Sequence, residues 1–99
     1  MTTFRVGVIG AGSIARSHLT AYSQNPDVEL IAVADMNLER AQQATDQHGA
    51  RRAYADPREL LADPEIDGVS ICTWNNSHAN WAIAAVKAGK HVQIGRAHV

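Results

Sequence analysis

Short apolar runs alternate with longer amphipathic segments along most of the chain. Phe4–Ile9, Val28–Ala34 and residues 68–72 are rich in β-branched side chains and have few charges. Such runs are typical of strands that are buried on both faces of a parallel sheet. Shorter runs at 51–54 and 91–94 indicate two further strands, of which the first has the weaker pattern.

Helical patterns follow four of these runs, and residues that start or stop helices flank them. Asn37 is placed to cap one helix, while Asp56 and Pro57 are placed to open a shorter one that carries Leu60 and Leu61. We expect the helices at 14–24, 38–48, from residue 57 and at 78–88. Repeated β-α units with short connections predict an α/β fold, a doubly wound parallel sheet of the Rossmann type that is incomplete at the C-terminus.

Composition limits the size and the partners of this fold. With 99 residues, 45% of them hydrophobic, the chain can form one small core but not a complete two-domain enzyme. A net charge of −1 gives no electrostatic basis for binding nucleic acid or an anionic membrane. No apolar stretch approaches the roughly 18 residues that span a bilayer. A single cysteine and no leader-like N-terminus lead us to expect a cytoplasmic protein.

The most informative segment is the glycine-rich turn between the first strand and the first helix. Gly10 permits a sharp turn, Gly12 leaves room for a pyrophosphate, and the small Ala15 lets the helix pack closely on the strand. The phosphates would then bind the free N–H groups of the helix N-terminus. Glycine-rich turns are common, so the motif gains its weight from lying between a strand and a helix.

Asp35 lies 20 residues after Ala15, at the carboxyl end of the second predicted strand. An acid at this place can accept hydrogen bonds from the hydroxyls of an adenosine ribose and would repel a 2′-phosphate. The sequence therefore favours NAD over NADP as the cofactor. Arg40, one helical turn further on, could swing toward a phosphate, although a solvated arginine on the helix surface is the simpler interpretation.

The polar segment that follows the fourth predicted strand, residues 73–78, should face the same crevice as the glycine turn. Its side chains could hold a ribose or a nicotinamide. Asn76 or Ser77 could equally be a helix cap, and His78 could be a helix residue without a role.

Other reactive side chains have structural interpretations. Trp81, Ala85 and Ala88 share one helix face, which predicts core packing, and Cys72 has no evident activating partner. The histidines lack metal-ligand spacing, so we expect no metal site.

Several motifs in order give the chain a resemblance to a known family. V-G-V-I-G-A-G-S-I-A, I-A-V-A-D, Y-A-D-P-R-E-L-L-A-D-P-E-I-D-G-V-S-I-C-T-W-N-N-S-H and A-V-K-A-G-K-H-V occur between residues 4 and 92. Together they resemble the N-terminal domain of the Gfo/Idh/MocA oxidoreductases. The resemblance implies binding of NAD or NADP here, a second domain for a sugar, a cyclitol or a related hydroxy compound, and a homo-oligomeric parent protein.

The same resemblance implies roles for particular residues. Gly10, Gly12, Ser13, Ile14 and Ala15 match the pyrophosphate turn of the family. The ribose acid is matched by Asp35, and the cofactor loop T-P-N-x-x-H by Thr73, Asn75 and His78, with Trp74 in place of the proline.

The last seven residues depart from the family pattern. The family continues with E-K-P, whose lysine belongs to the active site, where this chain reads Gln93-Ile94-Gly95-Arg96-Ala97-His98-Val99. Arg96 could in principle replace that lysine, but arginine stays protonated near neutral pH and is a poor proton donor and acceptor. We therefore assign no catalytic residue in this chain. The adapter sequence AGATCGGAAGAGCACACGTC, preceded by C, encodes the same seven residues. We therefore interpret 1–92 as a partial cofactor domain, 93–99 as adapter read-through, and the substrate domain as absent.

The expected function follows from this division. The parent protein would be an oxidoreductase that transfers hydride between a nicotinamide and a hydroxy compound, while this fragment would bind the nucleotide without catalysis. Two alternatives stay open, a non-catalytic dinucleotide sensor and a Rossmann domain for a flavin or S-adenosylmethionine.

Overall fold

A computed structural model describes residues 4–73 and 77–94 of the chain. Five strands form one parallel sheet in the order β3-β2-β1-β4-β5. Along the chain the elements are β1 (Phe4–Ile9), α1 (Ser13–Gln24), β2 (Val28–Ala34), α2 (Leu38–His48), β3 (Arg52–Tyr54), α3 (Pro57–Leu61), β4 (Gly68–Ile71), α4 (Ser77–Lys87) and β5 (His91–Ile94). The predicted doubly wound α/β fold is confirmed.

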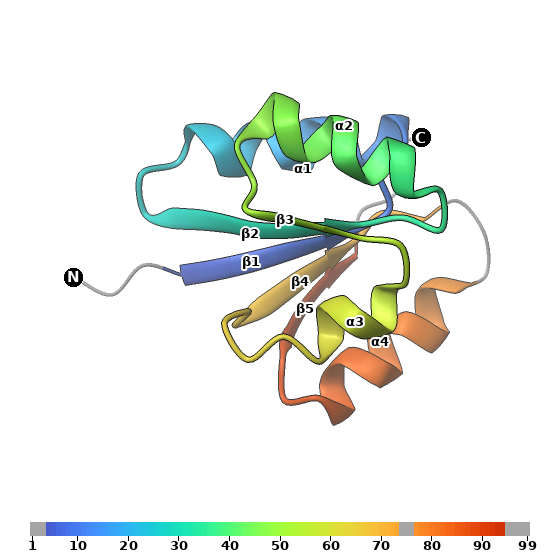
Figure 1. The fold of residues 1–99 in the computed structure, drawn as a ribbon. Coiled ribbons are helices and arrows are strands. Elements are labelled where there is room, and N and C mark those ends of the chain that lie inside the picture. The colour runs from blue at the N-terminus through green and yellow to red at the C-terminus, as the bar shows by residue number, and fades with distance from the viewer. Residues whose placement is uncertain (1–3, 74–76, 95–99) are drawn as a thin grey trace.

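Helices cover both faces of the sheet. Figure 1 shows α1 and α2 on one face and α3 and α4 on the other. One buried cluster contains Val8 and Val33 of the sheet and Leu19 of α1. A second buried cluster contains Ile31 of the sheet and Leu60 of α3. The central strands carry apolar side chains on both faces of the sheet. They therefore appear as continuous hydrophobic runs in the sequence.

The predicted helix ends agree closely with the structure. The Asn37 side chain accepts hydrogen bonds from the N–H groups of Glu39 and Arg40 at 3.1 and 3.4 Å. Gly49 ends α2 in the left-handed conformation, with φ of 75°. Asp56 caps α3 by accepting from the Arg58 N–H at 2.9 Å. These caps satisfy backbone groups that the helix itself leaves free.

Five boundaries differ from the prediction by one residue. α1 and α4 begin one residue early, at Ser13 and Ser77, and β4 and α4 end one residue early, at Ile71 and Lys87. β3 begins one residue late, at Arg52. The core prediction for Ala88 is wrong. α4 ends at Lys87, so Ala88 follows the last helical turn and is exposed. Its predicted partners fit better, because Ala85 is fully buried and Trp81 is half-buried against the same core.

Ion pairs join the amino ends of neighbouring strands. Arg5, on β1, pairs with Asp67, which precedes β4, at 3.2 Å. Arg51, before β3, pairs with Glu29 of β2. These contacts fix the strands at the edge of the sheet opposite to the glycine turn.

Asp63 is the buried centre of this amino-edge network, with only 7% of its surface exposed. Its carboxylate accepts hydrogen bonds from the Arg52 guanidinium at 2.8 Å, the Tyr54 hydroxyl at 3.0 Å and the Glu65 N–H at 2.9 Å. Burial raises the pKa of Asp63, but the hydrogen bonds and the charge of Arg52 outweigh burial and hold that pKa below its usual value.

Among the helices of the described residues, none combines the length and the apolar character that crossing a membrane requires.

Candidate functional site

The carboxyl ends of β1, β2 and β4 meet at the glycine-rich turn. Gly10 has φ of 100°, and a Cβ atom at this position would lie 2.7 Å from the carbonyl oxygen of Cys72. Its N–H donates to the Ala34 carbonyl at 2.7 Å. Only glycine meets both demands, the positive φ and the close approach of β4, so the turn is fixed by its sequence.

The N-terminus of α1 opens directly from this turn. Gly12 precedes the helix in an extended conformation and offers no side chain as a cap, and the first turn contains no acidic residue. The first N–H groups of a helix lack intrahelical acceptors and carry partial positive charge. Ala15 is completely buried, so α1 lies close to the sheet. This end of the helix can bind an anion.

The Asp35 carboxylate is held beside the turn by backbone hydrogen bonds. One oxygen, Oδ2, accepts from the Ala11 N–H at 2.9 Å, and the other, Oδ1, accepts from the Asn37 N–H at 2.8 Å. The Asp35 N–H donates to the Tyr54 carbonyl at 3.1 Å. A carboxylate has about four acceptor positions, so both oxygens can still accept hydrogen bonds from a ligand. Sequence reasoning placed Asp35 correctly but did not foresee its bond to the glycine turn.

A cavity of about 300 Å³ lies against these groups. Its lining is largely apolar, and Met36, one wall of it, is 79% exposed. The residues that line it are Ile9, Gly10, Ala34, Asp35, Met36, Pro57, Thr73 and Trp81. Met36, Pro57 and Trp81 were not among the predicted site residues. Trp81 had been assigned to the core alone, and its helical spacing could not show that the residue also lines a cavity.

The structure brings Thr73 into this cavity together with Asp35. Asn75 and Trp74 lie outside the described residues, so their predicted place in the loop is not tested. Ser13 and Ile14 occupy the first turn of α1, and His78 lies in the first turn of α4. The positions of these three side chains are also outside the described part of the structure.

Cys72 lies at the end of β4, next to the turn, and is buried. Burial raises the pKa of its thiol to about 11. The thiol is therefore protonated near neutral pH and is not a nucleophile. Within the described residues, no three histidine, cysteine or acidic side chains gather in a way that could hold a metal ion.

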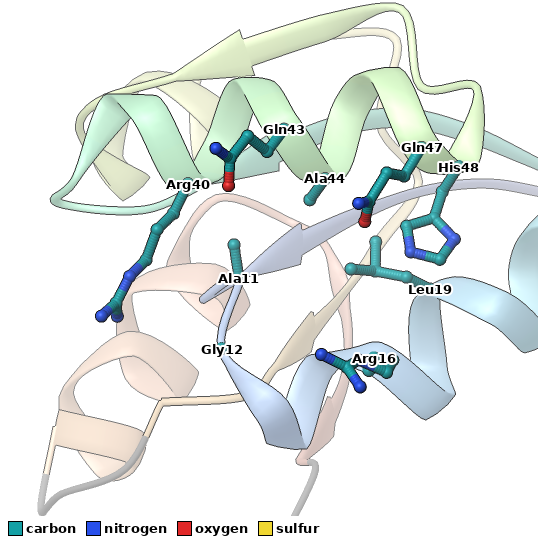
Figure 2. A pocket seen from close by; sticks show the side chains of 9 residues that line it. All are labelled: Ala11, Gly12, Arg16, Leu19, Arg40, Gln43, Ala44, Gln47 and His48. Atoms are coloured by element: carbon teal, nitrogen blue, oxygen red, sulfur yellow. The ribbon is translucent and has the colours of Figure 1, made fainter.

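A groove of about 450 Å³ lies between α1 and α2, on the other side of the glycine turn. Figure 2 shows the polar side chains Gln43, Gln47 and His48 extending from α2 toward this groove. Arg16 of α1 and Arg40 of α2 also line it.

Fold and site together define a dinucleotide-binding domain of the Rossmann type, with a glycine turn, a free helix N-terminus and an acid after β2. The sequence pattern of the oxidoreductase family with an NAD-binding Rossmann fold, Gfo/Idh/MocA, matches residues 4–95. The chain belongs to this family.

The curated relatives include dehydrogenases that act on a cyclitol and on a glucoside. The chain is 39% identical over 88 residues to the myo-inositol 2-dehydrogenase of Thermotoga maritima, a match that covers 89% of this chain and 26% of the relative. It is 37% identical over 89 residues to the D-glucoside 3-dehydrogenase of Escherichia coli, covering 89% of this chain and 25% of that protein. The chain thus spans about a quarter of the length of these relatives.

Among the solved structures with the same fold, one is a complex with NADH and another is a complex with NADP. A levoglucosan dehydrogenase in complex with NADH superposes with a TM-score of 0.88 at 34% identity, covering 94% of this chain and 27% of that one. A 3-ketoreductase from Actinomadura kijaniata in complex with NADP and TDP-benzene gives 0.86 at 34% identity, covering 94% and 29%. These relatives do not decide between the two cofactors for this chain.

Proposed function

We propose that this chain binds NAD(H) at the carboxyl edge of its sheet and is the cofactor-binding part of a dehydrogenase. The parent enzyme would act on the CH–OH group of a sugar, a cyclitol or a related compound. The support for this class of substrate is the printed activity of the relatives, which include inositol, glucoside and levoglucosan dehydrogenases.

The pyrophosphate would bind the turn from Gly10 to Gly12 and the first turn of α1, at Ser13, Ile14 and Ala15. This assignment rests on the uncapped start of the helix and on the absence of an acidic side chain there. The N–H groups of Gly10, Ala11 and Ala15 already donate within the chain, so the other backbone N–H groups of this segment would supply the hydrogen bonds. The helix dipole would favour the negative charge.

The observation that carries the proposal is the position of Asp35. Its two hydrogen bonds to backbone N–H groups, at 2.9 and 2.8 Å, fix a carboxylate beside the glycine turn. From there it would accept hydrogen bonds from the 2′- and 3′-hydroxyls of the adenosine ribose. A 2′-phosphate would meet like charge at this point, so we expect NADH to bind more tightly than NADPH.

The cavity beside Asp35 would receive the adenosine. Met36 offers an exposed, polarisable side chain for contact with an aromatic base, and Trp81 and Pro57 supply further apolar surface. Thr73 lines the same cavity. We place Asn75 and His78, which follow it in the chain, near the more distant part of the cofactor.

The bound nicotinamide would accept hydride from the substrate carbon. The described residues of this chain would hold and orient the cofactor. Because the chain spans about a quarter of its relatives, we place the proton acceptor, the substrate domain and the contacts of a homo-oligomer outside it. We therefore expect nucleotide binding without turnover from the 99-residue chain.

Titration with NADH, followed by fluorescence, tests this proposal. Asp35→Ala should weaken NADH binding about tenfold, because it removes two hydrogen bonds to the ribose, and should weaken NADPH binding less. Asp27→Ala, an exposed aspartate in the turn between α1 and β2 at the opposite edge of the sheet, is the matched control. Circular dichroism checks that each variant is folded. Equal losses for both cofactors would show that Asp35 does not bind the ribose. Tighter binding of FAD or S-adenosylmethionine than of NADH would overturn the proposal.

A further inference from the structure

The described helices cover one face of the sheet only in part. α1 and α2 contact β2 and β3 on that face, while α4 contacts β4 and β5 on the other. Figure 1 shows α1 and α2 above β1, β2 and β3, whereas β4 and β5 lie beside α3 and α4. Because a parallel sheet is normally buried on both faces, the α1 side of β4 and β5 is an unusual surface to leave in water.

The strand register shows which side chains lie on that surface. Val6, Gly68 and His91 form one row across β1, β4 and β5. Val6 belongs to the buried cluster that contains Leu19 of α1, so the whole row lies on the α1 side of the sheet. We call this surface the open face, and its residues are Phe4, Tyr22, Gly68, His91 and Gln93.

Two adjacent hollows mark the open face. Their volumes are about 190 and 230 Å³, and Tyr22 and Gln93 line both of them. Phe4, which is 39% exposed, lines the first hollow, and the half-buried His18 of α1 lines the second. The open face is therefore uneven enough to receive side chains from another segment.

Aromatic side chains lie over this face, and charged ones are absent from its hollows. The Tyr22 hydroxyl hydrogen-bonds the buried hydroxyl of Ser70. A Cβ atom at Gly68 would lie 2.6 Å from the Phe4 ring, whose centroid is 5.9 Å from that of His91. Among the described residues that line the two hollows, none is an aspartate, glutamate, lysine or arginine. Aromatic enrichment and depletion of charge are typical of the core of a protein interface.

The topology of the sheet limits which segment of a longer protein could cover the open face. β5 follows β4 through α4, on the opposite face. A further parallel strand beside β5 would be reached by a right-handed crossover in the same direction, so its helix would lie beside α4. A cover for the open face would therefore come from beyond the next β-α unit, about 30 residues further along the chain. The chain spans about a quarter of its relatives, so a parent of their length has such a segment.

We propose that the open face binds the apolar side of a helix from this later part of the parent protein. The helix completes the layer over β4 and β5, as α1 and α2 do over β2 and β3. Its apolar side chains enter the two hollows, and Tyr22 and His18 offer polar edges to it. Apart from Gln93, every residue of the open face precedes the segment that we interpret as adapter read-through. The proposal shares with the proposed function only the premise of a longer parent.

Cysteine labelling of the full-length parent, expressed from its native reading frame, tests the proposal. Cys72 is buried and the pKa of its thiol is raised to about 11, so the wild type should react slowly with a maleimide. Ser17→Cys places a thiol at the second hollow, and Ser23→Cys, at another exposed serine of α1, is the matched control outside it. In the parent, Ser17→Cys should react at least about tenfold more slowly than Ser23→Cys, because the reagent must wait for local opening. The two should react at equal rates in the 99-residue chain and in urea.

Equal labelling of the two cysteines in the native parent would overturn the proposal. Protection of Ser17→Cys in the 99-residue chain that grows with protein concentration would assign the open face to a second copy and would overturn it as well.

A photo-crosslinking amino acid in place of Ala21, which lines the second hollow, identifies the cover in the parent. Crosslinks should join it to a segment more than about 30 residues after β5, and crosslinks to the segment directly after β5 would overturn the assignment. NADH titration of the 99-residue chain is a separate readout. A chain that binds no NADH would refute the proposed function and leave the labelling result unchanged.

Discussion

The two edges of the sheet handle charge in opposite ways. At the amino edge, Arg5, Arg51 and Arg52 pair with carboxylates that come from other segments of the chain. At the carboxyl edge, Asp35 bonds only backbone N–H groups, and Arg16 and Arg40 line a groove without a carboxylate. The first arrangement fixes strands relative to one another, whereas the second keeps acceptors and donors available to a ligand.

This difference separates structural charges from candidate functional ones without reference to any relative. Asp63 is a buried charge whose partners are all present. Removal of one partner from such a group leaves a buried charge uncompensated and lowers the stability of the fold. A charge whose hydrogen-bonding capacity is only partly used can bind a ligand at little structural cost. Substitutions at the amino edge should therefore change stability, and substitutions at the carboxyl edge should mainly change binding.

Gly10 is the exception, because it lies at the carboxyl edge but its substitution should also change stability. We expect this substitution to have the largest effect on the free energy of unfolding. Gly10→Ala should lower the free energy of unfolding by about 3 kcal/mol, because the positive φ and the contact with the Cys72 carbonyl are both unfavourable for a Cβ atom. Gly49→Ala is the matched control. It has a φ of 75° but no atom within 4 Å of the added Cβ, so it should cost about 1 kcal/mol. Urea denaturation measures both values, and equal losses would show that the contact with β4 is unimportant.

Asp63→Asn should have the next largest effect. It leaves Arg52 with one carboxylate fewer in a half-buried network, and we expect a loss of about 2 kcal/mol in the free energy of unfolding. NADH affinity of the folded variant should be unchanged, because the network lies at the opposite edge. Asp46→Asn, on the exposed surface of α2, should change stability by less than about 0.5 kcal/mol. A variant that keeps its stability but loses NADH binding would contradict the division between the two edges.

We expect a smaller, pH-dependent difference in stability between the wild type and Asp63→Asn. The pKa of Asp63 is lower in the folded protein than the value of about 3.9 for an unfolded chain. The contribution of the Asp63 charge to the free energy of unfolding is therefore present above about pH 4 and is lost as the pH falls through the pKa of the folded state. The stability difference between wild type and Asp63→Asn should be full at pH 6 and should shrink below pH 4. A difference that stays constant down to pH 2 would mean that the charge of Asp63 contributes nothing.

Much of the fold could be predicted because the signals are local. Buried central strands appear as apolar runs, and Asn37, Gly49 and Asp56 act on backbone groups within a few residues of themselves. The glycine turn and Asp35 were also located from spacing alone. Parallel topology brings the carboxyl ends of β1 and β2 together, which places these two features side by side.

The remaining features depend on contacts between distant segments. The bond from Ala11 to Asp35 spans 24 positions, and the cavity requires Met36, Pro57 and Trp81 from three different elements. Arg40 taken alone reads as a solvated helix residue, and only the packing of α1 beside α2 shows that Arg16 shares its groove. No single-sequence pattern records such convergence.

Mapping of NADH onto the labelled chain by amide chemical shifts tests the central claim most directly. Saturating NADH should shift the amides from Gly10 to Ala15 and those of Asp35, Met36 and Thr73, while the amides of Arg5, Arg52 and Asp63 at the amino edge stay in place. Shifts concentrated at the amino edge, or none at either edge with NADH in excess, would contradict the account.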